Sequence, residues 1–383
     1  MDTVLVSGGS GGHLVPALAL AGRLREEGRC VLISTQRPVD RILFSASEQE
    51  APESLRAVSV PEWVAVEMEG FRPLRRWAMP GFAGRQLRAV RQIREVIRRV
   101  KPDAIVGFGG YLSAVGVFAA RRAGIPSVIH EQNVFPGGSN RWAARFCDAV
   151  AVSFPETARH FRTHRRVEVT GNPIRLTPGR RDPAGARRHF GFDAERPVLL
   201  VVGGSQGSRT INSLTLGMWE ERPPEDRRRV QVLHLAGPSA EQVEMAYHRL
   251  GMVHRVFPFL HEMEMVLSAA TLAVSRAGAT GITEMAAFGV PALLIPYPYA
   301  KQHQLANARW MERTGGAAVL EERGLTPQRL WESVSNLLRD ERRLEEMGRA
   351  LRKQPDGAAT GRLASLVRRV AGVSVRVPEL VTA

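Results

Sequence analysis

The run Val4-Leu5-Val6-Ser7-Gly8-Gly9-Ser10-Gly11-Gly12-His13 decides the fold of this chain. A short apolar segment passes directly into a glycine-rich turn, which is typical of a buried parallel strand that leads into a helix in a nucleotide-binding fold. Glycine suits such a turn because the backbone bends tightly and a ligand approaches without a Cβ in the way. The helix that follows offers unpaired N–H groups and the positive end of its dipole to an anion. The N-terminus therefore predicts a phosphate-binding α/β domain.

A second turn of the same kind, Gly203-Gly204-Ser205-Gln206-Gly207, follows the apolar run 198–202. The chain has 383 residues, which is long for a single core, so two domains are expected. Apolar and helical segments alternate in the βαβ manner through both halves. We therefore expect an α/β protein with two Rossmann-like domains, each a doubly wound parallel sheet, whose glycine turns face one phosphorylated ligand.

The turn cluster Gly171-Asn172-Pro173, with the Pro-, Gly- and Arg-rich stretch after it, marks the domain boundary. The expected organisation is an N-terminal domain over 1–172, a linker over 173–197, a second domain over 198–355, and a C-terminal helix and tail over 356–383 that can return to the first domain. The expected strands are 3–7, 30–34, 104–107, 126–130, 149–152, 198–202, 230–235, 271–274 and 292–295. The expected helices are 13–27, 84–100, 113–123, 139–146 and 281–288, followed by a helical tail over 326–370.

Composition narrows the class of protein. Hydrophobic residues make up 44% of the chain and charged residues 24%, which is typical of a globular protein. Cys30 and Cys147 give neither a disulfide framework nor a metal-ligand spacing, so a reducing compartment is expected. The N-terminus lacks the pattern of a signal peptide, and no stretch approaches the 18 or so apolar residues of a membrane span. These features predict a cytosolic protein.

The formal net charge of +15 is concentrated in residues 71–101, which carry ten basic side chains and a single acidic one. From residue 85 onward the pattern is helical, and a crossover helix with a solvated basic face is expected. The expected apolar stripe of this helix is formed by Leu87, Val90, Ile93, Ile97 and Val100.

Residues 71–82 differ from the helix because they mix aromatic side chains with prolines and arginines. This mixture favours a surface loop that rests on an anionic membrane surface, with Phe71, Trp77 and Phe82 inserted. Nucleic acid is the rival partner for a basic patch, but the chain shows no zinc-ligand spacing and no aromatic RNA-binding signature, so no nucleic acid is expected.

Competing glycine-loop chemistries are disfavoured. A dinucleotide fingerprint needs a third glycine and an acid after the second strand, whereas this chain has His13-Leu14 and Ser34-Thr35-Gln36 there. No Gly-Lys-Ser/Thr P-loop is present, and no Asp-x-Asp is available to hold a divalent cation between diphosphate oxygens. We therefore expect no cofactor and no metal, and a diphosphate neutralised by helix N-termini and side-chain donors.

A third segment, Ser275-Arg276-Ala277-Gly278 followed by residues 279–287, is expected to form a strand end, a glycine turn and a helix with Glu284 in its first turn. An acid in a first turn favours the helix dipole, so Glu284 has an ordinary capping interpretation. The alternative is a carboxylate that accepts both hydroxyls of a ribose.

Six motifs in register reveal a family resemblance. The motifs are Gly8-Gly9-Ser10-Gly11-Gly12-His13, Gly109-Gly110-Tyr111, His130-Glu131-Gln132-Asn133, Gly171-Asn172-Pro173-Ile174-Arg175, Gly203-Gly204-Ser205-Gln206-Gly207, and Arg276-Ala277-Gly278-Ala279 with Glu284. With these motifs the chain resembles the MurG family of bacterial glycosyltransferases, which add N-acetylglucosamine to the lipid-linked muramyl-peptide precursor of peptidoglycan. The resemblance runs from Val4 to about Glu321.

The resemblance implies a GT-B fold, in which two Rossmann-like domains face each other across a cleft, and a donor, UDP-N-acetylglucosamine, held mainly by the C-terminal domain. By matching position, the backbone of Leu260 reads the uracil, Glu284 holds the ribose and Ser205 holds the diphosphate. The implied donor contacts are Ser10, Gly11, Gly12, Asn133, Arg175, Ser205, Leu260, Ala279, Thr280, Gly281, Ile282, Thr283, Glu284 and Gln304.

The resemblance also implies an acceptor, the lipid I molecule undecaprenyl-pyrophosphoryl-MurNAc-pentapeptide, and a peripheral location on the cytoplasmic face of the cell membrane. Inversion at the anomeric carbon requires deprotonation of the incoming hydroxyl. His13 is the first candidate for this base because histidine titrates near neutral pH, although it can instead cap the helix or bind a phosphate. Glu131 is the second candidate, with a buried structural acid as its alternative. Tyr111 either lines the acceptor side or packs as an ordinary tyrosine.

Two other functions stay open at this point. A related GT-B enzyme can use a UDP-sugar with another lipid or small-molecule acceptor. A non-catalytic nucleotide-sugar-binding protein can keep the same folds without the chemistry.

Overall fold

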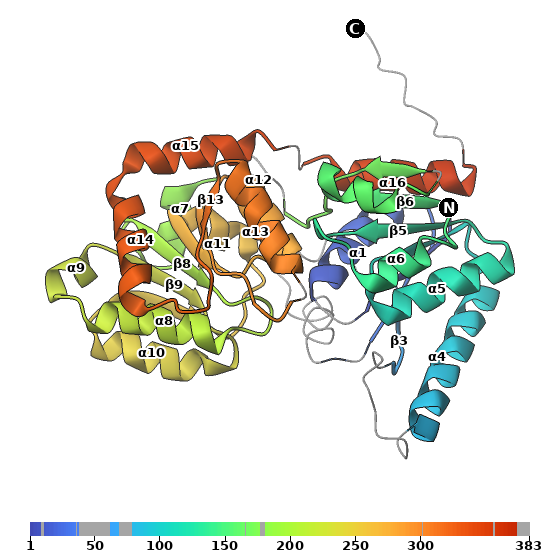
Figure 1. The fold of residues 1–383 in the computed structure, drawn as a ribbon, viewed down its shortest axis with the longest axis horizontal. Helices are drawn as coiled ribbons and strands as arrows, with labels where there is room; N and C mark the ends of the chain where they lie inside the picture. Colours follow the sequence, from blue (N-terminus) through green and yellow to red (C-terminus); the bar gives the residue numbers. More distant parts are fainter. Residues whose placement is uncertain are drawn as a thin grey trace, which may run out of the picture. The chain divides into compact units, whose positions relative to one another are not determined.

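A computed structural model describes residues 1–8, 11–35, 37, 62–68, 79–164, 166–176, 181–300, 302–354 and 357–373, without the side chains of 79–83 and 85. The chain divides into two compact units (Figure 1). The N-terminal unit comprises Met1–Gln132, Pro136–Arg175 and Ala358–Ala383, and the C-terminal unit comprises Asn133–Phe135 and Leu176–Gly357. Each unit is built around one parallel sheet, which confirms the predicted fold class.

Within the described residues, the N-terminal sheet has seven strands in the order β3-β2-β1-β4-β5-β6-β7. The five central strands confirm the sequence prediction, because their apolar runs are buried on both faces. The two edge strands were not predicted, since they are only partly buried and lack such runs. The strands are β1 (Thr3–Val6), β2 (Cys30–Ser34), β3 (Glu62–Ala65), β4 (Ala104–Gly107), β5 (Ser127–Glu131), β6 (Ala149–Val152) and β7 (Val167–Val169).

Helices cover both faces of this sheet. Figure 1 shows α4, α5 and α6 following one another along one face, while α1 and α16 pack together on the other. α16 is held there by Arg362, whose Nε donates to the carbonyl of Thr170 at 2.9 Å, and by an ion pair between Arg368 and Glu27. The helices are α1 (Gly11–Leu24), α4 (Met79–Val100), α5 (Gly110–Ala123), α6 (Gly138–Ala143), η2 (Pro155–Phe161) and α16 (Ala359–Ala371).

Helix α4 corrects the prediction in two respects. It begins at Met79 rather than at residue 84, with Pro80 in the first turn, where the missing N–H costs no hydrogen bond. Leu87 is 60% exposed, so its assignment to the apolar stripe is wrong. Leu87 precedes the buried Ala89 by two residues, or about 200° around the helix, and so lies on the opposite, solvent-facing side. Ile93, with Ile97 and Val100, is buried as expected.

In the part of the C-terminal unit that the structure describes, the sheet has six strands in the order β10-β9-β8-β11-β12-β13. Its four inner strands were predicted, and its edge strands β10 and β13 were not. The strands are β8 (Val198–Val202), β9 (Gln231–Leu235), β10 (Val253–Phe257), β11 (Leu272–Ser275), β12 (Ala292–Leu294) and β13 (Ala317–Val319). The helices are α7 (Pro183–His189), α8 (Arg209–Glu220), α9 (Pro224–Arg228), η3 (Gly237–Ser239), α10 (Ala240–Arg249), α11 (Met263–Ala269), α12 (Ala279–Phe288), α13 (His303–Arg313), α14 (Pro327–Arg339) and α15 (Glu341–Arg352).

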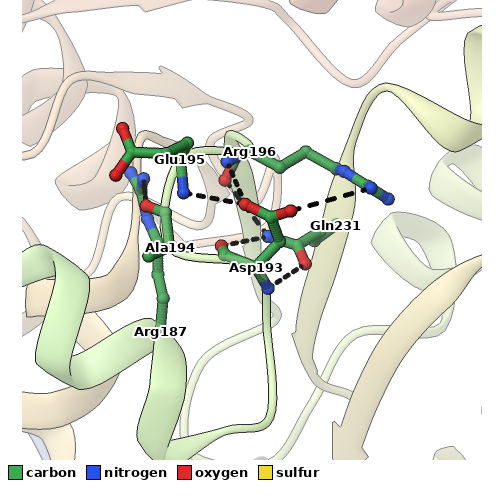
Figure 2. A network of polar contacts seen from close by, with 6 residues as sticks. All are labelled: Arg187, Asp193, Ala194, Glu195, Arg196 and Gln231. Atoms are coloured by element: carbon green, nitrogen blue, oxygen red, sulfur yellow. Dashed lines mark hydrogen bonds and ion pairs between the residues drawn. The ribbon is translucent and has the colours of Figure 1, made fainter.

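The segment before β8 is folded, although it falls in the stretch expected to be a linker. It contains α7, and a compact polar network joins it to β9 (Figure 2). Asp193 Oδ1 accepts from the backbone N–H groups of Glu195 and Arg196 at 2.9 and 3.1 Å, and the Gln231 amide bonds both the N–H and the carbonyl of Asp193 at 2.7 and 2.9 Å. Arg187 donates to the carbonyl of Ala194 at 2.6 Å. The network fixes the point at which the chain enters the sheet.

A buried polar chain lies behind the second glycine turn. Asn212 Nδ2 donates to the carbonyl of Ala236 at 3.0 Å, so Asn212 Oδ1 accepts from His234 Nε2 at 3.1 Å. The other ring nitrogen of His234 then accepts from the hydroxyl of Tyr247 at 3.0 Å. Burial lowers the pKa of His234 to about 3, so the ring is neutral in the folded protein.

This buried ring makes stability depend on pH. The unfolded chain protonates His234 near its ordinary pKa of 6.5 and the folded chain only near 3, so the free energy of unfolding falls as the pH falls from about 6.5. Between pH 7 and pH 5, the free energy of unfolding measured in urea should therefore fall by about 2 kcal/mol more for the wild type than for His234→Asn. Equal losses in the two proteins would contradict a neutral buried ring.

Candidate functional site

His13 lies at the amino end of α1, which begins at Gly11 rather than at residue 13, so Gly11 and Gly12 belong to the helix and not to the expected turn. Its imidazole packs against the backbone of Gly109, the residue that precedes α5. A Cβ at Gly109 would lie 2.8 Å from His13 Cε1 and 3.0 Å from its Nδ1, and Gly109 has a φ of +105°. Only glycine fits there, which explains the first residue of the Gly109-Gly110-Tyr111 motif. Ser10 lies outside the described residues.

The Nδ1 side of the His13 ring also meets Gln132, directly after β5. His13 Nδ1 and Gln132 Oε1 are 2.9 Å apart. Gln132 is itself buried and bonds the carbonyl of Phe108 at 2.9 Å. Gln132 is not among the site residues predicted from the sequence, although its place between Glu131 and Asn133 in a family motif is a usable signal.

Glu131 has a different environment. Its side chain is buried, and its Oε2 accepts from the backbone N–H of Gly137 at 3.0 Å and from Asn140 Nδ2 at 2.9 Å. These bonds hold the loop that leads into α6. The geometry favours the structural interpretation of Glu131 and makes His13 the stronger candidate for the base.

Tyr111 is 50% exposed at the amino end of α5, two residues after the glycine that supports His13. It is therefore not an ordinary packed tyrosine. Its position agrees with a role on the acceptor side, which stays a prediction.

The second glycine turn joins β8 to α8. Gly204 and Gly207 have φ values of +90° and +70°, and the Gly207 N–H donates to the Gly204 carbonyl at 2.9 Å. A Cβ on Gly203 would lie 2.3 Å from the backbone nitrogen of Ser208. Ser205 is exposed at the tip of this turn, where its hydroxyl can reach a ligand.

Arg276 ties this turn to the neighbouring strands. Its side chain is buried, forms an ion pair with Glu322, and donates to Ser208 Oγ at 2.8 Å and to the carbonyl of Ile295 at 3.1 Å. Ser208 in turn caps α8 by accepting from the N–H of Ile211 at 3.3 Å. Arg276 thus positions the turn from behind, a role that our interpretation of its motif did not include.

The helix that carries Glu284 corrects the sequence prediction. α12 begins at Ala279 rather than at 281, so Glu284 is its sixth residue and the first turn contains no acid. The effect of the helix dipole is confined to the first turn, so the capping interpretation is wrong. Of residues 279–284, only Gly281 and Glu284 are partly exposed. The side chain of Ile282 is fully buried, so any ligand contact there involves its backbone.

The remaining donor-side residues lie in loops and at helix starts. Gln304, in the first turn of α13, accepts from the N–H groups of Tyr297 at 2.9 Å and Ala277 at 3.3 Å through Oε1, which directs its Nε2 group elsewhere. Asn133 Oδ1 accepts from Asn307 Nδ2 at 3.0 Å. Leu260 is partly exposed between β10 and α11, and Arg175 is the last residue of its segment of the N-terminal unit. Phe71 and Trp77, and the side chain of Phe82, lie outside the described residues.

Among the described residues, no group of three or more His, Cys, Asp or Glu side chains is arranged to hold a metal ion. In the same part of the chain, no helix combines the length and apolar character needed to cross a membrane.

Comparison with known proteins places this geometry in a family. Residues 3–152 match the glycosyltransferase family 28 N-terminal domain, and residues 198–360 match the C-terminal domain of the same family. The crystal structure of Acinetobacter baumannii MurG has a TM-score of 0.70 to this chain, with 26% identity, and covers 96% of this chain and 99% of that one.

Two relatives share the name UDP-N-acetylglucosamine–N-acetylmuramyl-(pentapeptide) pyrophosphoryl-undecaprenol N-acetylglucosamine transferase. The one from Halothermothrix orenii is 34% identical and covers 97% of this chain and 99% of its own, and the one from Clavibacter michiganensis is 37% identical over 95% of both chains. The fold and the two matched domains define a hexosyltransferase of the GT-B class. Within that class, this chain belongs to the MurG family.

The contact between Gly109 and His13 predicts that alanine variants of the two glycines flanking α5 differ in kcat. Gly109→Ala drives a methyl group into the imidazole, so kcat should fall by about 100-fold. Gly124→Ala is the matched control, because Gly124 also has a positive φ, +69°, but has no atom within 4 Å of the added Cβ. It should lose about 1 kcal/mol of stability and keep its kcat. Equal losses of kcat in both variants would show that backbone strain, and not the position of the ring, matters.

Proposed function

We propose that the chain transfers N-acetylglucosamine from UDP-N-acetylglucosamine, with inversion, to the C4 hydroxyl of MurNAc in undecaprenyl-pyrophosphoryl-MurNAc-pentapeptide. This reaction converts lipid I to lipid II in peptidoglycan synthesis. The observation that carries the proposal is the near full-length similarity to relatives of that name at 32–37% identity. The geometry around His13 supports it, since a histidine is held beside a glycine turn by a backbone that only glycine allows.

The C-terminal unit binds the donor in this proposal. The exposed Ser205 and the N–H groups of its turn hold the diphosphate, and the amino end of α12 lies at a glycine turn that can receive the same ligand. Glu284 accepts the ribose hydroxyls, because it is partly exposed and does not serve as a cap. Gln304 offers its Nε2 group to a sugar hydroxyl, because its Oε1 is occupied by two backbone N–H groups.

His13 supplies the base. As the C4 oxygen of the acceptor bonds to the anomeric carbon, its proton passes to the imidazole and the bond between that carbon and the UDP oxygen breaks. The electron pair leaves on UDP, whose developing charge is stabilised by the turn at Ser205, by Arg175 and by backbone N–H groups in place of a metal ion.

An acceptor assay tests this assignment. With a lipid I analogue and labelled UDP-N-acetylglucosamine, the wild type should transfer the label to the muramyl sugar. His13→Ala should lower kcat by about 100-fold or more while the KM for the donor changes little, because the base acts in the transition state and not in donor binding. Transfer to other acceptors alone would overturn the choice of lipid I. Unchanged turnover of His13→Ala would overturn the role of His13.

We also propose that the N-terminal unit docks on an anionic membrane surface at the cytoplasmic face. Phe118 on α5 and Trp142 on α6 are 37% and 42% exposed, and both rings contact Phe146, with centroids 5.3 and 4.7 Å away. Exposed arginines lie close to these rings in the sequence, and membrane-surface binding combines such apolar and basic side chains: Arg121, Arg122, Arg141 and Arg145. Residues 71–82 were expected to be a loop that makes the same contact. Of these, 71–78 lie outside the described residues, and 79–82 are instead the first residues of the basic helix α4, which packs beside α5.

Vesicle binding tests the membrane proposal. Serine at both Phe118 and Trp142 should weaken sedimentation with phosphatidylglycerol vesicles, because apolar insertion is lost while the arginines stay. Serine at both Trp77 and Phe82 should also weaken it, because these aromatic side chains are proposed to insert as well. Met245→Ser is the matched control, since Met245 is 54% exposed on α10 of the other unit. If vesicle binding is unchanged in both double variants, or is weakened equally in the control, the aromatic residues do not contribute to membrane binding and this part of the proposal is wrong.

A further inference from the structure

We propose that Gln132 is a positioning residue that holds His13 in its Nδ1–H tautomer, so that the neutral ring presents its Nε2 lone pair to the acceptor hydroxyl. The inference rests on the proposed function only for the use of that lone pair. The tautomer itself follows from a chain of hydrogen bonds within the N-terminal unit.

The chain starts at His130, on β5. Its Nε2 lies 2.9 Å from the carbonyl oxygen of Gly171, and a carbonyl oxygen only accepts, so Nε2 carries the hydrogen. His130 is fully buried, which lowers its pKa to about 4 and keeps the ring neutral. Its Nδ1 is therefore an acceptor.

The amide of Gln132 is oriented by three acceptors. Its Nε2 lies 2.9 Å from the carbonyl of Phe108, 3.1 Å from the carbonyl of His130 and 3.0 Å from the Nδ1 of His130. The reversed amide would place Oε1 against two carbonyl oxygens and a ring lone pair in a buried site, which is strongly unfavourable. Gln132 Oε1 must therefore point away from them.

That oxygen lies 2.9 Å from His13 Nδ1. Because an amide oxygen accepts and does not donate, Nδ1 of His13 carries a hydrogen. The neutral ring is therefore the tautomer with its hydrogen on Nδ1 and its lone pair on Nε2. The close packing of the ring on Gly109 fixes its plane as well.

In hydrolytic triads, a carboxylate orients the histidine base through the ring nitrogen that does not react. Here a neutral amide takes the place of that carboxylate. The other bonds of Gln132 go to backbone carbonyls and to a ring that stays neutral over the working pH range. The amide orients His13 without placing a negative charge beside it.

The tautomer is measurable without any activity. Long-range ¹⁵N–¹H spectra of the full chain labelled at histidine nitrogens, with His13 assigned by its loss in His13→Ala, should show a protonated Nδ1 and an unprotonated Nε2 in the neutral ring. Gln132→Met keeps the volume but removes the acceptor, so the Nε2–H form should gain population. A wild-type His13 with its hydrogen on Nε2 would overturn the proposal.

Kinetics give the second readout. Gln132→Met should lower kcat by about 10- to 100-fold, with the KM for UDP-N-acetylglucosamine changed less than about twofold. Thr170→Val is the matched control, because the Thr170 hydroxyl donates to the same carbonyl of Gly171 at 3.1 Å without touching Gln132. It should leave both the spectrum and kcat near wild type. If it lowers kcat as Gln132→Met does, the effect is structural and the proposal fails.

The two readouts separate this inference from the proposed function. A correct tautomer in a protein that transfers no sugar to lipid I would sink the assignment of the reaction and leave the role of Gln132 in orienting the ring intact. A protein that transfers the sugar to lipid I normally but holds His13 in the opposite tautomer would support the assignment of the reaction and contradict the role of Gln132.

Discussion

The carboxyl ends of parallel strands meet at one edge of a sheet, and the polar groups buried there have to satisfy one another. In the N-terminal unit, β1, β4 and β5 are neighbours, so His13 at the start of α1, the Phe108-Gly109 corner and the end of β5 lie close together. Water is excluded from much of it, and an unmatched donor or acceptor would cost about 1–3 kcal/mol. The position of His13 is a consequence of how this polar cluster is satisfied.

The C-terminal unit meets the same constraint with a different side chain. There β8, β11 and β12 are adjacent, and Arg276 joins the carbonyl at the end of one strand to the cap of α8. A buried guanidinium needs a counter-ion, which Glu322 supplies, together with hydrogen bonds for its remaining donors. The polar groups at the strand ends are therefore joined by the Gln132 amide in the N-terminal unit and by the Arg276–Glu322 ion pair in the C-terminal unit.

Much of this architecture is predictable from the sequence, and the exceptions have physical causes. The central strands are apolar runs buried on both faces, so their positions follow from composition alone, whereas edge strands such as β3 are half-exposed and carry no such run. The start of α12 was placed two residues late, which put Glu284 in the wrong turn, because helix ends depend on backbone geometry that residue types specify weakly.

The role of Gln132 was not predictable in this way. It depends on His130, Phe108 and Gly171, which lie 2, 24 and 39 residues away along the chain and meet only in the folded sheet. A motif showed that the position matters, but hydrogen-bond directions showed why. Sequence patterns report which residues are present at a site, and the direction of each donor appears only when the acceptors around it are known.

A neutral orienting group suits the chemistry proposed for this site. Donor and acceptor both carry diphosphates, so a carboxylate beside the base would repel both substrates through a region of low dielectric. The carboxylate that is nearest in sequence, Glu131, is instead buried and bonded to the loop before α6, where Gly137 and Asn140 compensate it. An amide orients the ring and adds no charge, so the imidazole can act as a base while the anionic substrates still bind. The adjacent residues Glu131 and Gln132 thus have separate tasks, since one holds a loop and the other holds the base.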